Sequence, residues 1–594
     1  MQKKFRGEVK IFLNRSTQFL MAFSAVCYND CTYQQKKVLA LKMASVVVLI
    51  DSESKKKRHK YGLNVFELYI EEILAHAGIP FRTITEISGL DTCDADIVIA
   101  SVTAEDEETA GRLWSYADSG GVLISYGGLQ ALAERLGVHK RTPAETGYAL
   151  LPEYELAPVP LRYLRAEAWH TEQCAAAYGS LHRISPDAVE VGALLQQWQA
   201  GSGAIHRWAV DIPTTVAQLQ LGTKPVLADG IPAPDGTAAI NENILKADDG
   251  IELDWQLDRK HTDTGMPYFA YPYADYWRQL LVSHLIRCAL DRGLTLPFVG
   301  QWPEGTEQVA LISFDSDFNI DETAKTTLDV LQKLNVPSTW CMIEPGYSPA
   351  IYTRVLEEGH ELALHYNALE KEDGVWGADA FKQQLEWVRA ATGVNPIVSN
   401  KNHYTRYEGW GELFKWCEDN GIAVDQTRGP TKRGNVGFLF GTCQPYFPIS
   451  WFDEQNRLYD VLEIGFVTQD MNHPALSDTS IVEPLLEQIA KVGGVAHFLF
   501  HQIHIHEKEP VRRAIGELVE KARERGYSFW TSQQVNDWQR KRRKVRITGL
   551  NNSGEVQLEC SSVKQPVIVW VPASEKQADM SYLYGIPCVQ QVFI

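Results

Sequence analysis

The chain has 594 residues, of which 45% are apolar and 22% are charged, and its formal net charge is −18. This length is too great for one hydrophobic core, so we expect three or four domains. An acidic chain repels phosphate backbones, which disfavours nucleic acid as a partner. No stretch approaches the roughly 20 apolar residues that a membrane-spanning helix needs, so we expect no membrane span.

The ten cysteines are scattered along the chain and form no C-x-x-C pair. This spacing disfavours zinc knuckles and a disulfide scaffold, and it favours a reducing compartment. We therefore expect a cytoplasmic protein, with secretion as the alternative. That alternative depends on residues 1–43, where a basic start precedes a short apolar run that could serve in a signal peptide. We interpret residues 1–43 as a poorly ordered extension.

Residues 44–149 alternate apolar strands with amphipathic helices, which predicts a doubly wound α/β domain. The strands are continuous apolar runs, as expected for parallel strands that are buried on both faces, at 46–50, 96–100 and 122–125. The pattern resembles the flavodoxin-like fold of class I glutamine amidotransferases. Ser125-Tyr126-Gly127-Gly128 stands where such an enzyme would present its nucleophile, and no cysteine is there. We therefore interpret this domain as non-catalytic.

Three further segments surround the central part of the chain. Residues 150–265 are rich in proline and acidic turns and contain only short apolar runs, which predicts a β-rich insertion with long loops. Residues 266–300 return to an amphipathic helix and then a linker, and we expect this helix to pack back on the first sheet. Residues 541–594 contain short strands separated by turns, which predicts a small β-sandwich.

Residues 301–540 repeat a βα unit seven or eight times, which predicts a distorted (β/α) barrel. The predicted strands lie at 309–314, 338–343, 361–365, 396–399, 423–425, 461–466, 495–500 and 528–531. Catalytic groups of a parallel barrel lie at the C-terminal ends of its strands. The acids and histidines found there are Asp315, Asp317, His365, His403, Asp425, His501 and His504. Together they could hold a metal ion.

The sequence around three of these strand ends resembles the polysaccharide deacetylases (NodB homology, carbohydrate esterase family 4-like). Residues 309–317 resemble the first family motif, T-F-D-D, with Ser316 inserted between the two acids. Residues 359–365 resemble G-H-E-I-x-x-H, and residues 498–501 resemble L-x-x-H. The resemblance covers about 230 residues and is specific only when the three motifs are taken together.

This resemblance implies a metal-dependent hydrolase that removes acetyl groups from a polysaccharide or a related carbohydrate. Asp315 would be the catalytic base, Asp317 and His365 would bind the metal, and His501 would be the general acid. The insertion of Ser316 leaves an exchange of roles between the two acids open. The implied cofactor is a divalent metal, with zinc as the first choice and cobalt or nickel as alternatives.

Two departures from the family pattern affect the predicted metal site. Leu369 stands where the second histidine of the second motif belongs, and the R-x-P-Y motif is absent. We propose His403 as the replacement third ligand, with Asn367 as the second choice. A carboxylate should hold the ring of His501, and we assign this role to Asp425.

Each assignment has an alternative. Asp315 and Asp317 could cap the helix that starts near Asp321, and His365 could be a hydrogen-bonded core residue. The barrel could also be a degenerate carbohydrate-binding scaffold that has lost its metal. A glycoside hydrolase that uses Asp315 or Asp317 together with Asp425 is a third possibility. We interpret His497 as a core residue and the basic run 540–546 as a solvated linker.

Overall fold

The computed structural model describes residues 42–152, 154, 156, 159–559, 565–574 and 580–593. The extension expected at residues 1–43 therefore lies outside the described residues, except for its last two. Those two residues form strand β1 (Lys42–Met43), which pairs in parallel with β15 (Leu294–Thr295). The first described strand thus begins before the first apolar run, at which the sequence predicts the first strand.

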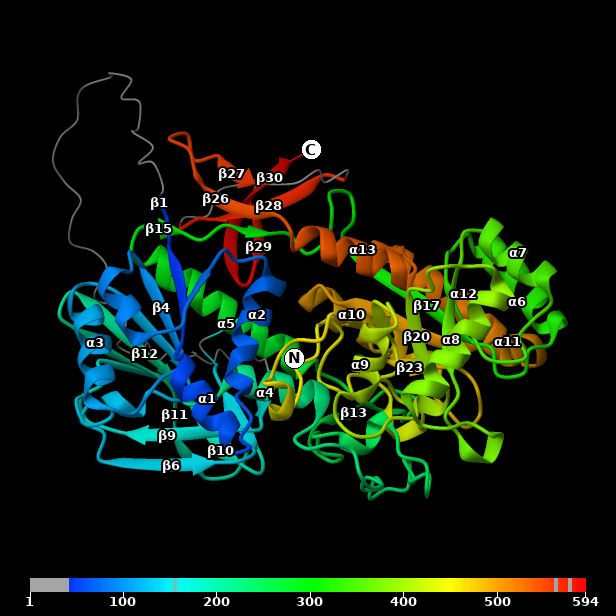
Figure 1. The fold of residues 1–594 in the computed structure, drawn as a ribbon, viewed down its shortest axis with the longest axis horizontal. Helices are drawn as coiled ribbons and strands as arrows, with labels where there is room; N and C mark the ends of the chain where they lie inside the picture. The colour runs from blue at the N-terminus through cyan, green and yellow to red at the C-terminus, as the bar shows by residue number, and fades with distance from the viewer. Residues whose placement is uncertain are drawn as a thin grey trace, which may run out of the picture. The chain divides into compact units, whose positions relative to one another are not determined.

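The first sheet is built on five parallel strands in the order β3-β2-β4-β5-β12. Figure 1 labels two of them, β4 and β12. Their bounds are β2 (Val46–Ile50), β3 (Arg82–Ile84), β4 (Ile97–Val102), β5 (Val122–Tyr126) and β12 (Gly203–Trp208). All residues of β2 and β5 are buried, as expected for apolar strands that are covered on both faces. The three predicted strands of residues 44–149 are therefore present.

The same sheet continues through four antiparallel strands beyond β12. In spatial order they are β11 (Glu190–Ala200), β10 (Ala176–Arg183), β7 (Gly147–Leu150) and β8 (Leu161–Tyr163). The strands of the first half of the predicted β-rich insertion therefore extend the first sheet and do not form a sheet of their own. The sequence could not distinguish the two arrangements, since a strand on the edge of a sheet and a strand of a separate sheet have the same alternating pattern.

The second half of the predicted insertion contains few strands. Residues 222–250 form loops and one short 3-10 helix, and the nearest β-structure is the pair β13 (Arg259–His261) and β14 (Pro267–Phe269). A further antiparallel pair joins β6 (Lys140–Ala144) and β9 (Ala166–His170). The long loops expected here are present, and they contribute to the cavity described below.

Five helices belong to the first part of the chain. They are α1 (Ser52–Lys60), α2 (Ile70–Ala77), α3 (Glu107–Asp118), α4 (Ile212–Leu221) and α5 (Tyr273–Leu290). Helix α5 is buried on almost every side, and its Trp277 indole donates to the carbonyl of Arg162 in β8. It also contacts the second half of the chain, where Asp275 accepts a hydrogen bond from Thr442 at 2.6 Å. The helix is thus shared between the two sheets.

The second sheet is parallel throughout, with the order β22-β21-β20-β19-β18-β17-β24-β23 and with β25 also paired to β17. The central strands are β17 (Gln308–Asp315), β18 (Thr339–Met342), β19 (Glu361–Tyr366), β20 (Ser399–Asn402) and β24 (Val495–His501). The outer strands are β21 (Val424–Asp425), β22 (Leu462–Glu463), β23 (Thr468–Gln469) and β25 (Tyr527–Phe529). The sheet is a half-barrel with two ends, so the prediction of a distorted barrel is confirmed in this form.

Helices flank the strands of this half-barrel in the expected alternation. They are α6 (Asp321–Leu334), α7 (Pro349–Glu357), α8 (Ala378–Thr392), α9 (Glu412–Asp419), α10 (Val482–Val492), α11 (Gln502–Glu507), α12 (Glu509–Glu524) and α13 (Ser532–Arg542). The largest differences from the predicted boundaries concern two strands. The strand predicted at 396–399 lies three residues later, and the strand predicted at 461–466 is reduced to β22, with β23 lying beyond it.

The C-terminal segment forms a hairpin and a four-stranded antiparallel sheet of order β16-β28-β30-β29. The bounds are β16 (Phe298–Val299), β26 (Arg546–Leu550), β27 (Val556–Glu559), β28 (Val567–Pro572), β29 (Ser581–Leu583) and β30 (Ile586–Phe593). Side chains from the hairpin and from the sheet pack in one apolar cluster with β17 and α13.

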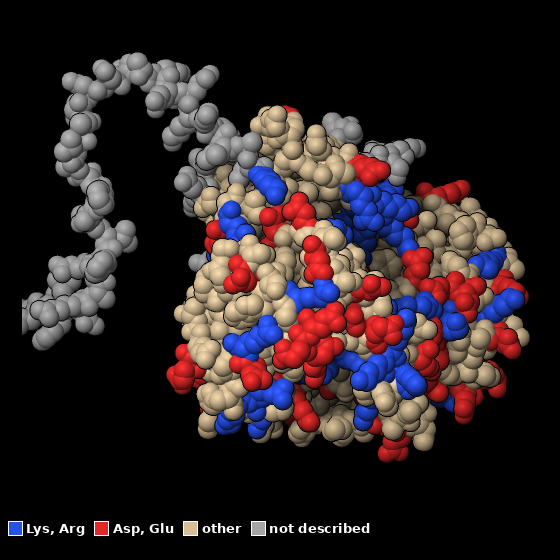
Figure 2. Space-filling view, turned by 60° about the vertical axis from the view of Figure 1, so that its left-hand side comes forward, with Lys and Arg blue, Asp and Glu red and all other residues tan. Residues whose placement is uncertain are grey.

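The basic run before this segment is bound to the rest of the chain. Arg542 is buried and donates to the carbonyls of His76, Val299 and Gly300, while Arg543 forms an ion pair with Glu72 at 2.6 Å. The expectation of a solvated run is therefore wrong for Arg542 and Arg543, whereas Lys541, Lys544 and Arg546 are exposed. Figure 2 shows basic and acidic side chains interspersed over one face, with one gathering of basic side chains. None of the described helices combines the length and the apolar character that a membrane-spanning helix requires.

Candidate metal centre

The candidate residues meet at the C-terminal edge of the half-barrel. Asp315 is the last residue of β17 and pairs with His501, the last residue of β24. His365 lies near the end of β19, and His403 directly follows β20. Because all these strands are parallel, their carboxyl ends lie at one edge and present their polar side chains together.

Asp317, His365 and His403 form a compact triangle of potential ligand atoms. The Nε2 atom of His365 lies 3.1 Å from Nδ1 of His403, and each of these nitrogens lies 3.3 Å from Oδ1 of Asp317. With metal–ligand bonds of about 2.1 Å, ligand atoms are about 2.9 Å apart in octahedral and about 3.4 Å apart in tetrahedral coordination. The three atoms therefore already have the spacing of a shared metal ion.

In each histidine, one ring nitrogen points away from the triangle, and the partner of this outer nitrogen determines which ring nitrogen carries the proton. Nδ1 of His365 lies 2.9 Å from the carbonyl oxygen of Lys401, which can only accept, so this nitrogen is protonated. Nε2 of His403 lies 3.2 Å from the carboxylate of Glu372, which likewise favours a proton on Nε2. Both inner nitrogens therefore present lone pairs toward each other and toward Asp317. This arrangement of a ligand held by an outer acceptor is typical of metal-binding histidines.

The charge on Asp317 is strongly stabilised by its surroundings. Burial alone would raise the pKa of this carboxyl, but the positive charge of the neighbouring His501 acts against burial, and the pKa lies well below its usual range. Its Oδ1 atom is buried and accepts no hydrogen bond within the described part of the chain. A buried carboxylate oxygen without a donor is expensive unless a cation contacts it.

Asp315 has a cationic partner that the sequence did not suggest. The ammonium group of Lys401 is fully buried, lies 3.3 Å from Oδ1 of Asp315 and donates to the hydroxyl of Ser313 at 2.5 Å. Oδ2 of Asp315 lies 3.8 Å from Nε2 of His365. Asp315 therefore adjoins the triangle without being part of it, and Lys401 holds it in place.

The carboxylate that holds His501 is Asp470. Its Oδ2 lies 2.5 Å from Nδ1 of His501 and 2.8 Å from Nδ1 of His504, while its Oδ1 accepts from the backbone N–H of His501 at 2.9 Å. Burial disfavours the charged His501 ring, but the carboxylates of Asp470 and Asp317 raise its pKa to about 10. His501 is thus protonated at neutral pH, with Nε2 3.5 Å from Asp317.

The prediction that Asp425 holds His501 is therefore wrong. Asp425 is fully buried and accepts hydrogen bonds from Asn400 at 2.8 Å and from Thr427 at 2.9 Å. Its neighbour Glu463 is kept neutral, because burial and the Asp425 carboxylate raise the pKa of Glu463 well above its usual range. Asp425 belongs to an internal network and does not line the cavity, so it cannot serve as the second carboxylate of a glycoside hydrolase.

Three other assignments can be compared with the structure. Helix α6 begins after Ile320 and has no side-chain cap, which rules out the capping role considered for Asp315 and Asp317. His497 is fully buried and bonded to Ser313 at 2.8 Å, in agreement with the core interpretation. The amide oxygen of Asn367 accepts from the backbone N–H of Leu369, so this second choice of ligand is engaged elsewhere.

A cavity of about 480 Å³ opens onto this group of side chains. Asp315, Asp317, His403 and His501 line one wall. A further part of the wall is formed by residues of the loop segment 236–246, which precedes the half-barrel in the chain. The buried Lys246 belongs to this wall, and its ammonium group donates to the hydroxyl of Thr431 at 3.3 Å. The long loops of the first part of the chain therefore help to shape this cavity.

A comparison with known families identifies this region. Residues 303–406 match the polysaccharide deacetylase family. This segment runs from before β17 to just after His403, and it includes Asp315, Asp317 and His365. The search of curated proteins gave no match.

Solved structures with a similar arrangement include several enzymes of this class. A candidate polysaccharide deacetylase from Mycobacterium smegmatis is 15% identical, with a TM-score of 0.32, and the match covers 41% of this chain and 93% of that one. A family 4 acetyl xylan esterase from Clostridium thermocellum, solved with a cobalt ion, is 16% identical, with a TM-score of 0.24 and coverage of 39% and 91%. These likenesses are remote.

Proposed function

We propose that the half-barrel is a metal-dependent hydrolase that removes acetyl groups from a polysaccharide or a related carbohydrate. The match of residues 303–406 to the polysaccharide deacetylase family supports the reaction class. The observation that carries the metal dependence is the triangle of Asp317, His365 and His403. Two ring lone pairs and an unpartnered carboxylate oxygen face one another within 3.3 Å, an arrangement that a cation at the centre would stabilise.

Zinc fits this donor set, with cobalt or nickel as alternatives, because one carboxylate and two imidazoles leave coordination positions open. When bound, such a metal would polarise the acetyl carbonyl and acidify a water molecule. Asp315 lines the cavity next to the triangle and would accept the proton of the attacking water as general base. Lys401 would keep the Asp315 carboxylate oriented toward the cavity.

His501 would protonate the leaving nitrogen or oxygen of the sugar. The ring is protonated at neutral pH and its Nε2 faces Asp317, while Asp470 fixes its orientation through Nδ1. General acid catalysis by a positioned imidazolium is worth about 10² to 10⁴ in rate. The two proton-transfer groups thus come from neighbouring positions on β17 and β24.

For the rest of the chain we propose a flavodoxin-like domain at residues 44–208 that is related to glutamine amidotransferases and is non-catalytic, and a small C-terminal β-sandwich. The parallel order β3-β2-β4-β5-β12 supports the first assignment, since it is the strand order 2-1-3-4-5 of flavodoxin-like folds. The hydroxyl of Ser125 donates to the carbonyl of Gly127 and is buried, which supports a non-catalytic role.

The proposal is tested by acetate release from acetylated chito-oligosaccharides and acetylated xylan, with the full chain loaded with zinc or cobalt. We expect Asp315→Asn to lower kcat by about 10² to 10⁴ while the bound metal stays unchanged, because this residue moves a proton without binding the ion. Asp379→Asn makes the same change at an exposed position of α8 and should leave kcat unchanged. Undiminished acetate release by Asp315→Asn would refute the assignment of the base.

A further inference from the structure

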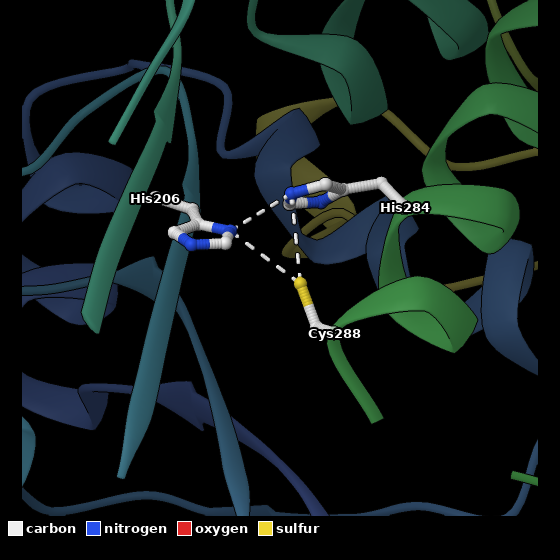
Figure 3. Close-up of side chains that lie close together, drawn as sticks. All are labelled: His206, His284 and Cys288. Atoms are coloured by element: carbon white, nitrogen blue, oxygen red, sulfur yellow. Dashed lines mark hydrogen bonds between the residues drawn. The ribbon is translucent and has the colours of Figure 1, made fainter. Parts of the chain in front are cut away.

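A second group of metal-binding side chains lies far along the chain from the half-barrel, between the first sheet and helix α5. Figure 3 shows His206, His284 and Cys288 converging on one point, with two residues on the helix and one on a strand. The Nδ1 atom of His206 lies 3.0 Å from Nε2 of His284 and 3.4 Å from the sulfur of Cys288. The third side of this triangle, from Nε2 of His284 to the sulfur, is 3.6 Å.

The sequence positions of these residues explain why they meet. His284 and Cys288 are four residues apart in α5, so they lie one turn apart on the same face of the helix. His206 and Trp208 alternate along β12 and project from the same face of the sheet. Helix α5 covers that face, since the Trp208 indole donates to Nδ1 of His284 at 3.2 Å.

We propose that His206, His284 and Cys288 form a zinc site. Zinc–nitrogen bonds of about 2.05 Å and a zinc–sulfur bond of about 2.3 Å give tetrahedral edges of about 3.3 Å between nitrogens and about 3.6 Å between nitrogen and sulfur. The three observed distances lie within about 0.3 Å of these edges. A mixed set of imidazole and thiolate ligands favours zinc over magnesium or calcium.

The hydrogen bonds of this group are poorly satisfied without a cation. The indole N–H of Trp208 can only donate, so Nδ1 of His284 holds a lone pair and the ring proton is on Nε2. That proton and the thiol proton of Cys288 then compete for the single lone pair on Nδ1 of His206. Two donors directed at one lone pair are a weak arrangement that a metal would replace with three bonds.

A second observation also indicates a missing partner. Tyr126 is in strand β5, where it pairs with Trp208 of the neighbouring strand β12, so both side chains project from the same face of the sheet. Tyr126 is only 6% exposed, and its hydroxyl has no hydrogen-bond partner within the described residues. Its ring lies against that of Trp208, with the ring centroids 6.5 Å apart. A fourth ligand, either this phenol or a water bonded to it, would complete the tetrahedron.

Metal binding has a defined proton balance. The Cys288 thiol loses its proton to solvent as the zinc–sulfur bond forms, as metal-bound thiols do. The Nε2 proton of His284 must move to Nδ1, where it opposes the Trp208 N–H, so the indole loses this hydrogen bond. Trp208 therefore weakens zinc binding, and Trp208→Phe should tighten it at least threefold.

The test is a cobalt titration of the full chain, read through the near-ultraviolet charge-transfer band from thiolate to cobalt. The half-barrel triangle contains no cysteine, so this band reports only on a cysteine site. We expect the band in the wild type and in Asp317→Asn, its loss in Cys288→Ala, and a weaker band in His206→Gln. Cys341→Ala is the matched control, because this buried cysteine lies in β18 next to Asp315, and it should keep the band.

A wild-type chain without the band under excess cobalt, or a band that persists in Cys288→Ala, would overturn the zinc site. If Cys288→Ala does not fold, His206→Gln provides the test, because the His206 side chain is only partly buried and its replacement should disturb the fold less. None of these outcomes depends on acetate release, so the proposal can fail while the deacetylase assignment stands.

Discussion

The two triangles differ in the partners of their outer ring nitrogens. In the half-barrel, His365 and His403 face a carbonyl and a carboxylate, which accept protons and leave the inner lone pairs free. In the first sheet, His284 faces the indole N–H of Trp208, which places the proton on the inner nitrogen. The two triangles have similar spacing but differ in protonation. The half-barrel triangle already presents its nitrogen lone pairs to a metal, whereas His284 must first move a proton from Nε2 to Nδ1.

The electrostatic surroundings of the histidines also differ between the two centres. Carboxylates of Asp317 and Asp470 raise the pKa of His501 to about 10 despite its burial. Burial lowers the pKa of His206 to about 4 and, together with His206 itself and Arg287, lowers the pKa of His284 well below its usual range. One centre thus holds charged groups and the other holds neutral ones, which suits catalysis in the first and structural binding in the second.

The largest effect expected is the loss of the half-barrel metal in Asp317→Asn or His365→Ala. Removing a charged or imidazole ligand from the triangle should abolish tight binding and lower acetate release on the order of 10³-fold or more, because the metal supplies several kcal/mol of charge stabilisation. Metal analysis and acetate assays check this. Retention of the metal in both variants would mean that the ion binds elsewhere, and the comparison of the two centres would then lose its basis.

The next effect concerns Asp470 and the pH profile. Asp470→Asn removes the carboxylate that raises the pKa of His501, so the acid form should be lost at lower pH than in the wild type. Because the general acid must be protonated, the alkaline limb of kcat/KM should move to lower pH, and kcat should fall by about 10- to 100-fold. A profile measured at saturating zinc checks this, and an unmoved alkaline limb would remove His501 from the role of general acid.

A smaller effect is expected from Glu372, the outer partner of His403. This carboxylate is 40% exposed, so solvent weakens its hold on the ring, and Glu372→Gln should lower metal affinity by about 10-fold or less. Glu370→Gln, at an exposed position two residues earlier, is the control and should leave affinity unchanged. Competition with a chelator measures both. Equal affinities in the two variants would show that the carboxylate does not set the His403 tautomer.

The sequence could single out the three proposed ligands because they obey one rule. Asp317, His365 and His403 come at or just after parallel strands, and such ends meet at one edge. The two residues that it missed, Lys401 and Asp470, lie where strand boundaries were misplaced. Lys401 is inside β20, which starts three residues later than predicted, and Asp470 directly follows β23, which lies beyond the strand predicted at 461–466. With correct boundaries the same rule would have found Asp470, but not Lys401, because the rule selects acids and histidines.

Other features could not be read from the pattern. The strands of residues 161–208 have ordinary strand periodicity, and only tertiary packing decides that they extend the first sheet. The pair His284 and Cys288 did carry a signal, because a spacing of four residues places both on one helix face. Its partner His206 comes from a strand nearly 80 residues earlier, and no local pattern connects them.

The smallest effect expected is on stability, in the first sheet. His206 has a pKa of about 4 when folded and an ordinary value of 6.5 when unfolded, so the unfolded chain binds more protons between these values. The stability that the neutral ring contributes is therefore present above about pH 6.5 and is lost as the pH falls toward 4. With a chelator present, the urea midpoint of the wild type should fall more between pH 7 and pH 5 than that of His206→Gln. Equal falls would mean that the ring is not held neutral by burial, and the contrast with the charged half-barrel centre would not hold.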